Sequence, residues 1–508
     1  MSTARPPLVV VGSGFAGSLI AMIAQRLGRP VVLLERGRHP RFAIGESTTP
    51  LTNLLLEEIA DEFDLPFLRP LSKWGTWQRD HPEMACGLKR GFTFLRHELG
   101  RPFPLDRARQ NQLLVGASPA DRVADTHWYR PDFDHFLVRQ AVALGVDYRD
   151  EVELASVTES TDGIRLRGAR HGRPFELNAG FLIDASGQRG FLHRRLGLLE
   201  KPLAGFPPTQ ALFAHFTNVA PLPTDLFPGT PPYPPEDAAM HHLFDGGWVW
   251  VLKFNNGITS AGVAATDEVA DRLGLRLGAA GWNNLLRELP TLADSFGSAS
   301  AITPFICQPR VAFQSATVTG PRWALLPSAA GFVDPLLSTG FPLTLLGIQR
   351  LGRLLRDSAG AEVPDGLADY ASVTTREFEA AAALVAALYR SMNDFNRFKD
   401  LSLLYFAAAS FSEAARRLGR ADLAPNFLLC GHPTFGPRLR ELCAAENPPT
   451  GRIREAIAPF DVAGLTDRSR DPWYPADPAD LYRHAAKLGA SEPEIAAMLA
   501  RCGLVAPA

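Results

Sequence analysis

Residues 8–37, LVVVGSGFAGSLIAMIAQRLGRPVVLLERG, decide the fold of this chain. An apolar run over 8–11 leads into a glycine-rich turn, which is followed by a segment with the apolar periodicity of a helix. A second apolar run then ends in Glu35. Strand, helix and strand in this order are typical of a parallel α/β sheet, so the segment predicts a Rossmann-like unit.

The glycine turn of this unit has the spacing of a dinucleotide-binding site. Gly12 allows a tight turn, Gly14 lets a pyrophosphate approach the backbone, and Gly17 lets the helix pack closely on the strand. Glu35 stands where an acidic residue accepts a hydrogen bond from a ribose hydroxyl. The residues predicted to contact the nucleotide here are Gly12, Gly14, Phe15, Ala16, Gly17 and Glu35.

A third apolar run identifies the dinucleotide. Residues 181–190, FLIDASGQRG, end the run in small residues that let a strand pass beneath the adenosine of FAD, which makes Asp184 and Gly187 cofactor candidates. FAD is therefore favoured over NAD. Because no second glycine turn of comparable context follows, we expect the reducing equivalents to come from a separate NAD(P)H flavin reductase.

Two further segments are candidates for flavin contact. The first is RFAIGESTTP, residues 41–50, with Glu46 and Ser47. The second is residues 128–142, where Arg130 precedes an apolar-periodic helix. For Arg130 a surface position beside the helix start is an equally good interpretation from these residues alone.

Composition limits the classes of partner. The chain has 508 residues, a formal net charge of -2 and a pI near 6.7, which favours neither nucleic acid nor an anionic membrane as partner. Its five cysteines have neither paired nor metal-ligand spacing, so we expect reduced thiols. No apolar run reaches the roughly 18 residues of a membrane helix and no signal segment is recognised, so a cytoplasmic protein is expected.

The middle of the chain predicts a sheet beside a proline-rich loop. Residues 221–235, PLPTDLFPGTPPYPP, exclude regular structure, whereas residues 241–254, HHLFDGGWVWVLKF, alternate like a strand pair that could roof a pocket. Trp248 and Trp250 fall on one face of that sheet. His241 and His242 fall on opposite faces, so we predict no metal site there.

Residues 327–357, PSAAGFVDPLLSTGFPLTLLGIQRLGRLLRD, predict an anion site. Ser338, Thr339 and Gly340 precede a helical pattern that runs to about Arg356. Backbone amides at that helix start would bind an anion, although an ordinary helix cap explains the same residues.

Together these motifs resemble the flavin-dependent halogenases, the superfamily that includes the tryptophan halogenases, and most closely its phenol and pyrrole branch. The resemblance rests on GSGFAG, on ACGLKRGF with Lys89, on the paired tryptophans and on GFVDPLLSTG. It implies an α/β fold, the FAD-binding Rossmann-like fold of GR2-type flavoprotein monooxygenases and halogenases. Residues 1–365 would form the FAD-binding core with an interleaved substrate-side β-sheet at about 205–315, and residues 366–508 a mainly helical region that closes the substrate pocket.

The resemblance also implies roles for single residues. Reduced FAD and oxygen would convert chloride or bromide, held at Thr339 and Gly340, into hypohalous acid. Lys89 would bind the acid or form a haloamine and would deliver halogen to an aromatic ring, as the catalytic residue. Trp248 and Trp250 would separate flavin from substrate. The resemblance further assigns Ser328 and Pro335 to the flavin site and Phe92 to the substrate pocket, with a carrier protein as a possible further partner.

Three departures from the family pattern bear on function. Leu252 and Lys253 stand where Ile-Pro is usual, and Pro327-Ser328 stand where relatives often have Gly-Asp. Leu337 replaces the glutamate of tryptophan-acting relatives, which favours a phenol-like substrate because a phenol can lose its own hydroxyl proton. A flavin-dependent aromatic monooxygenase and a degenerate flavoprotein are the alternatives.

Overall fold

The computed structural model describes residues 6–161, 163–358 and 362–504. Its first sheet is parallel throughout, with strand order β19-β11-β1-β2-β7. The predicted strand–helix–strand unit is its centre and comprises β1 (Leu8–Val11), α1 (Phe15–Arg26) and β2 (Val31–Leu34). The other strands are β7 (Asp147–Arg149), β11 (Phe181–Asp184) and β19 (Trp323–Leu325).

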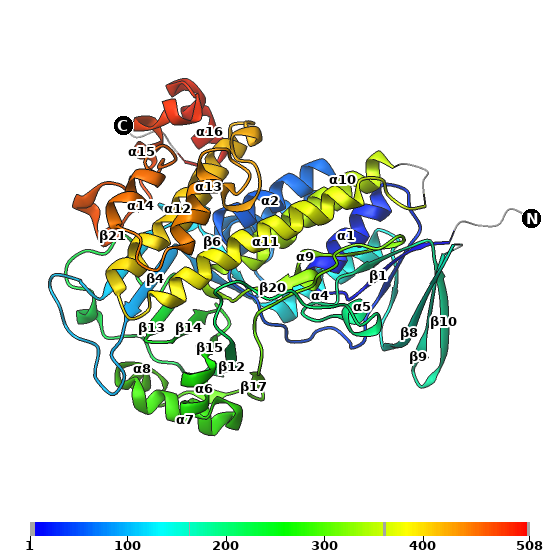
Figure 1. Cartoon of the computed structure of the whole chain (residues 1–508), viewed down its shortest axis with the longest axis horizontal. Helices are drawn as coiled ribbons and strands as arrows, with labels where there is room; N and C mark the ends of the chain where they lie inside the picture. The colour runs from blue at the N-terminus through cyan, green and yellow to red at the C-terminus, as the bar shows by residue number, and fades with distance from the viewer. Residues whose placement is uncertain (1–5, 162, 359–361, 505–508) are drawn as a thin grey trace, which may run out of the picture.

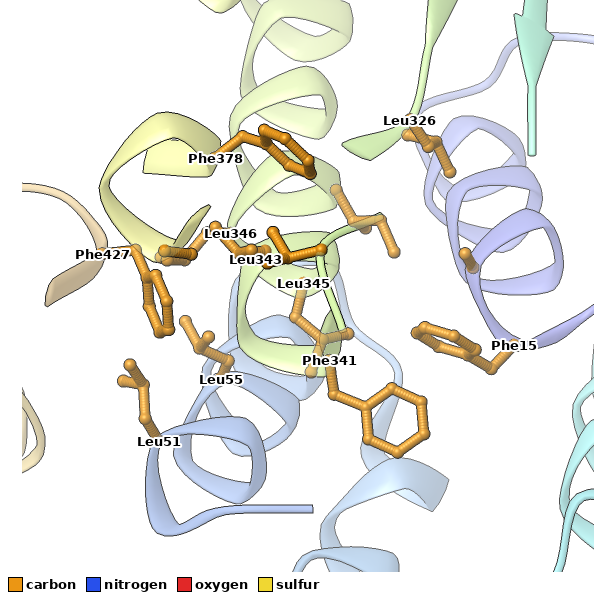
Figure 2. Packing of buried hydrophobic residues seen from close by; sticks show 14 of the residues in the cluster. Phe15, Leu51, Leu55, Leu326, Phe341, Leu343, Leu345, Leu346, Phe378 and Phe427 are labelled. Carbon is orange, nitrogen blue, oxygen red and sulfur yellow. The ribbon is translucent and has the colours of Figure 1, made fainter. Parts of the chain in front are cut away.

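Helices from distant parts of the sequence cover this sheet. They are α4 (Arg130–Ala143), α5 (Phe191–Arg195), α9 (Pro327–Ala330) and α10 (Gly340–Asp357), with α2 (Pro50–Glu62) and α3 (Trp74–Asp80) further out. Figure 2 shows Phe341 of α10 facing Phe15 of α1, with Leu51 and Leu55 of α2 nearby. The rings of Phe15 and Phe341 meet edge to face with centroids 5.0 Å apart. This packing joins the start of α10 to the glycine turn.

The second sheet has nine strands and lies beside the first. Its order is β16-β12-β15-β14-β13-β4-β5-β21, and β17 also pairs with β12. The strands are β4 (Gly91–Arg96), β5 (Gln112–Gly116), β12 (Thr209–Thr217), β13 (Ala239–Phe244), β14 (Gly247–Lys253), β15 (Ile258–Thr266), β16 (Ser300–Ala301), β17 (Ile306–Gln308) and β21 (Trp473–Tyr474). This sheet therefore includes strands from outside residues 205–315, because β4, β5 and β21 join it.

The two faces of this second sheet pack against different partners. Val249 and Val251 join a core with α6 (Asp267–Leu273), α7 (Ala279–Glu288) and α8 (Pro290–Phe296), which lie below the sheet in Figure 1. Trp248 and Trp250 join the main core on the other face, as the alternation predicted. The side chains of His241 and His242 likewise lie on opposite faces of the sheet. His241 stacks on the Trp248 ring at 5.1 Å, and His242 hydrogen-bonds His97 at 3.0 Å.

The carboxy-terminal region is helical, as expected, and covers the Trp248 side of the second sheet (Figure 1). It contains α11 (Leu367–Arg390), α12 (Phe395–Arg417), α13 (Phe435–Ala444), α14 (Thr450–Ile457), α15 (Pro478–Arg483) and α16 (Glu492–Arg501). None of the helices in the described ranges is both long and apolar enough to cross a membrane.

Smaller sheets complete the fold. A three-stranded antiparallel sheet of β8 (Val152–Ser160), β9 (Gly163–Arg170) and β10 (Arg173–Ala179) stands at the edge of the molecule in Figure 1. Two-stranded pairs are formed by β18 (Phe313–Gln314) with β20 (Gly331–Phe332) and by β3 (Cys86–Lys89) with β6 (Asp125–Trp128). Lys89, the residue predicted to be catalytic, lies on β3 in this pair. All five cysteines are free thiols.

Candidate active site

A cavity of about 860 Å³ opens between the two large sheets, a size within the usual range for cofactor sites. Most of the residues predicted from the sequence line it. They are Gly12, Gly14, Phe15, Ala16, Glu35, Glu46, Ser47, Arg130, Gly187, Trp248, Trp250, Ser328, Pro335, Thr339 and Gly340. We call this space the flavin cavity. Gly17, Asp184, Lys89 and Phe92 do not line it.

The glycine turn has the geometry that a dinucleotide requires. Gly12 has φ +98°, and a Cβ on it would lie 2.7 Å from the carbonyl oxygen of Ala185. A Cβ on Gly17 would lie 1.7 Å from the carbonyl oxygen of Gly12, so this glycine serves helix packing, as predicted. Gly14 faces the cavity, and its missing side chain leaves the backbone open to a phosphate.

Glu35 is an ionised acceptor at the end of β2. Its carboxylate accepts hydrogen bonds from the Ser13 amide at 3.0 Å and the Gly37 amide at 2.9 Å, and it pairs with Arg41 at 3.1 Å. Burial raises the pKa of Glu35, but Arg41 and the two amides outweigh burial and lower it to about 2. A carboxylate that stays charged at this position fits a ribose hydroxyl donor.

Arg130 is a buried structural clamp on the cavity wall and not a surface residue. Its guanidinium makes two 2.8 Å hydrogen bonds to the Asp134 carboxylate and one of 2.8 Å to the Gly45 carbonyl oxygen. The bidentate pair fixes the charge, and the bond to Gly45 holds the 41–50 loop over the cavity. Arg130 therefore presents a fixed positive charge close to Gly14.

Two predicted cofactor residues have structural contacts of their own. The Asp184 carboxylate is fully buried and accepts from the Ser186 amide at 2.8 Å and the Leu192 amide at 2.6 Å, so it shapes the turn that carries Gly187 and does not reach the cavity. Glu46 does line the cavity, but its carboxylate oxygen already bonds His215 Nε2 at 2.7 Å. A sequence motif alone does not show whether such a carboxylate contacts the cofactor or supports the local structure.

The predicted halide turn has an unusual backbone. Leu337 and Ser338 adopt φ values of +63° and +55°, which non-glycine residues rarely do. Thr339 then caps α10, a helix of 18 residues with no acidic side chain in its first turn. The strained turn and the positive helix end together produce a wall of the flavin cavity suited to an anion.

The two tryptophans form a wall between the sheets. Their rings lie 5.7 Å apart, and both side chains are buried. Trp248 Nε1 donates to Asp334 Oδ1 at 3.2 Å, while the Tyr389 hydroxyl of α11 donates to Asp334 Oδ2 at 2.8 Å. Burial raises the pKa of Asp334 to about 6. Sequence reasoning missed this network, although Asp334 lies within the quoted GFVDP segment.

Lys253, one of the departures from the family pattern, leaves the wall intact. It ends β14 and pairs with Glu236 at 2.7 Å, away from the cavity, whereas Leu252 lines the cavity. Both indoles are buried in the chain that carries Lys253.

A second cavity, of about 200 Å³, lies on the far side of Phe92, whose ring stacks on His241 of the flavin-cavity wall. It has room for a small ring system, since an engineered cavity of roughly 150 Å³ binds benzene. Its walls include Asn53, Phe92, Asp125, Tyr405, Phe406, the end of β5, and residues of α16. We call it the arene cavity. The sequence identified only Phe92 among these residues, because the others come from segments without a recognisable motif.

Lys89 stands between the two cavities and is fully buried. Its Nζ donates to Ser47 Oγ, on the flavin-cavity wall, at 2.8 Å and also to the Thr48 carbonyl oxygen. The same Nζ lies 3.8 Å from the centre of the Phe92 ring, on the arene-cavity wall. Burial lowers the pKa of Lys89, and the neighbouring Asp125 partly opposes that shift. The amine can therefore exchange a proton near neutral pH.

Comparison with known proteins gives a consistent result. The tryptophan halogenase family profile matches residues 126–398, just over half of the chain, and the FAD binding domain profile matches residues 8–215. The FAD-binding fold predicted from the glycine turn, and FAD as the cofactor predicted from residues 181–190, are thus confirmed.

Among curated proteins, the tetracycline 7-halogenase of Kitasatospora aureofaciens is 30% identical over 66% of this chain and 61% of its own length. The monodechloroaminopyrrolnitrin halogenase PrnC of Pseudomonas fluorescens is 27% identical over 69% of this chain and 62% of its own. The chain thus spans about three fifths of the length of these two relatives.

Among solved structures, a variant of the halogenase PltM in complex with FAD superposes with a TM-score of 0.81 at 24% identity, covering 91% of this chain and 98% of that one. PltM in complex with phloroglucinol and FAD gives a TM-score of 0.77 at 24% identity over the same shares. These similarities establish a shared fold. With the family match over most of the core, the chain belongs to the tryptophan halogenase family.

Proposed function

We propose that this protein is an FAD-dependent halogenase that uses reduced FAD, O2 and chloride or bromide to halogenate an electron-rich, phenol-like aromatic compound. The single observation that carries the proposal is the position of Lys89. Its buried amine touches the wall of the flavin cavity through Ser47 and the wall of the arene cavity through Phe92. An oxidant made in one cavity and used in the other has to pass such a group.

The flavin cavity provides the groups that would bind FAD and the halide. The glycine turn, Glu35 and Arg130 would hold FAD, and Thr339 and Gly340 at the start of α10 would hold the halide. Bound reduced flavin would supply, with O2, the two-electron oxidation of halide to hypohalous acid. Trp248 and Trp250 exclude the organic substrate from that reaction because their buried rings fill the wall.

Lys89 would act on hypohalous acid in one of two ways. As an ammonium it donates a hydrogen bond to the acid and makes the halogen more electrophilic, and as an amine it forms a haloamine. Its lowered pKa makes both protonation states accessible near neutral pH.

The substrate class follows from the arene cavity and from Leu337. A cavity of about 200 Å³ with Phe92, Tyr405 and Phe406 in its wall suits one small aromatic ring system. Leu337 leaves the start of α10 without the carboxylate of tryptophan-acting relatives, so an arene activated by its own hydroxyl is favoured. One relative, from Pseudomonas fluorescens strain Pf-5, is a chlorinase of pyrrole-2-carbonyl bound to a peptidyl-carrier protein, at 28% identity, so carrier-bound rings belong in the test. A separate flavin reductase is the proposed electron source.

The test is mass spectrometry of reactions with FAD, a flavin reductase, NADH, O2 and a panel of phenols, pyrroles and indoles, free and carrier-bound. Chloride or bromide is present in one series and omitted from the other. We expect a halogen isotope pattern on a phenol that needs the halide. A gain of one oxygen without halide would instead assign a monooxygenase, and failure to bind FAD in either redox state would assign a degenerate flavoprotein.

A further inference from the structure

A second ionisable group faces Lys89 across the β3–β6 pair. The strand register sets Asp125 directly opposite Lys89, so both side chains lie on the same face of this ribbon. Asp125 is buried and also lines the arene cavity, which Lys89 itself does not. The two groups are thus neighbours, and the carboxylate is the one in contact with the substrate space.

The Asp125 carboxylate is held in place but is only half satisfied. Asn53 Nδ2 of α2 donates to Oδ1 at 2.7 Å. Oδ2 is buried and has no hydrogen-bond partner within residues 6–161, 163–358 and 362–504. An unpaired buried carboxylate oxygen is costly, roughly 1–3 kcal/mol or more, so its retention beside a cavity points to a partner that arrives with the ligand.

We infer that Asp125 is the base that removes the proton from the aromatic ring of the substrate, in partnership with Lys89 as the proton donor to the departing oxygen. This inference rests on the proposed halogenase function. It assigns the role to a residue on β6, at the arene cavity, and explains how the chain functions with Leu337 at the start of α10.

The step is balanced with the groups present. The O–X bond of hypohalous acid breaks and a C–X bond forms with the ring, while the oxygen keeps its electron pair, takes a proton from the Lys89 ammonium and leaves as water. The ring C–H bond then breaks, its electrons restore the aromatic system, and its proton passes to Asp125. Asp125 then releases its proton to water, the Lys89 amine takes one up from water, and the sum is HOX + ArH giving ArX + H2O.

The surroundings of Asp125 suit a base that works near neutral pH. Burial raises the pKa of Asp125 and Lys89 opposes that rise, so the carboxyl group can accept and release a proton there. The other groups that face it from packed elements are Asn53 of α2 and Tyr405, Glu413 and Arg417 of α12. Glu413 is already paired with Arg417 at 2.7 Å, whereas Asp125 has a buried oxygen without a hydrogen-bond partner among the described residues.

The test compares Asp125→Asn with wild-type protein, using a phenol and its ring-deuterated form, and in parallel a small diketone that traps free hypohalous acid. Asp400→Asn is the matched control, because Asp400 is a mostly buried carboxylate on α12 with a raised pKa that lines neither cavity. We expect Asp125→Asn to slow phenol halogenation by about 100-fold or more, as for loss of a general base. Halogenation of the trap should not change.

The isotope effect separates a base from a residue that only positions Lys89. If Asp125 takes the ring proton, the deuterium isotope effect is near one in wild type and rises to about two or more in Asp125→Asn, while Asp125→Glu recovers part of the rate. An isotope effect that stays at one, or a rate no lower than that of Asp400→Asn, would overturn the inference and leave the halogenase function standing. Wild-type protein that halogenates neither phenol nor trap would overturn the proposed function and the inference with it.

Discussion

The flavin cavity and the arene cavity are built in opposite ways. The flavin cavity includes three contiguous segments with recognisable motifs, the glycine turn, the 41–50 loop and the turn before α10, together with residues of the second sheet. The arene cavity collects residues from α2, β4 and β6, all before residue 129, and from α12 and α16, both after residue 394. Sequence motifs therefore mark part of the flavin cavity, whereas the arene cavity depends on how the carboxy-terminal region packs.

The largest expected effect lies in the flavin cavity. Gly17→Ala would place a Cβ 1.7 Å from the Gly12 carbonyl oxygen, which forces α1 away from β1. We expect FAD affinity to fall by more than 100-fold, measured by fluorescence quenching with circular dichroism as a check on folding. Gly451→Ala is the control, since a Cβ there meets nothing within 4 Å. A dissociation constant for FAD within threefold of the wild-type value would contradict the role assigned to Gly17.

The second prediction uses pH to separate the two cavities. Burial raises the pKa of Asp125, which loses its base form on the acid side, and burial lowers the pKa of Lys89, which loses its proton on the alkaline side. Halogenation should therefore fall on both the acid and the alkaline side of an optimum, with each limb approaching about tenfold per pH unit. FAD affinity should stay level over the same range, because Glu35, with a pKa of about 2, remains ionised. A level halogenation profile from pH 5.5 to 8.5 would contradict the roles of Lys89 and Asp125.

A smaller effect is expected from the wall of the arene cavity. Phe92→Leu removes the ring that lies 3.8 Å from Lys89 Nζ and packs on Phe406. Loss of about 1 kcal/mol of aromatic contact predicts a three- to tenfold rise in KM for the arene, with FAD affinity unchanged. Steady-state kinetics checks this against Phe411→Leu, which alters a buried ring of α12 that lines neither cavity. Equal KM values for the two variants would remove Phe92 from the substrate site.

The smallest effect is expected at the residue that departs from the family motif. Lys253→Met breaks a half-exposed ion pair with Glu236, and such pairs contribute roughly 0.2–1 kcal/mol. We expect halogenation within twofold of wild type and a melting temperature within a few degrees. A tenfold loss of activity would show that the end of β14 controls the tryptophan wall.

The contrast between the cavities also explains what the sequence could predict. The parallel sheet, the tryptophan face and the start of α10 follow from local periodicity and glycine geometry, and the structure has them where they were expected. The amino-terminal and carboxy-terminal elements of the arene cavity meet only through tertiary packing. No sequence motif therefore marks Asp125, Asn53 or Tyr405 as residues of a site. Asp184 and Arg130 show the same limit, because their burial and hydrogen bonds depend on residues that a motif does not contain.

The central claim is that Lys89 transfers halogen from the oxidant made in the flavin cavity to the substrate in the arene cavity. The most direct test is the Lys89→Met variant in the halide-dependent mass spectrometry assay. Methionine keeps an apolar side chain of similar length and removes the amine, and Lys253→Met serves as the matched control. The account predicts that reduced flavin is still oxidised and the hypohalous acid trap is still halogenated, while the halogenated phenol disappears. Halogenated phenol formed at the wild-type rate by Lys89→Met would contradict the account.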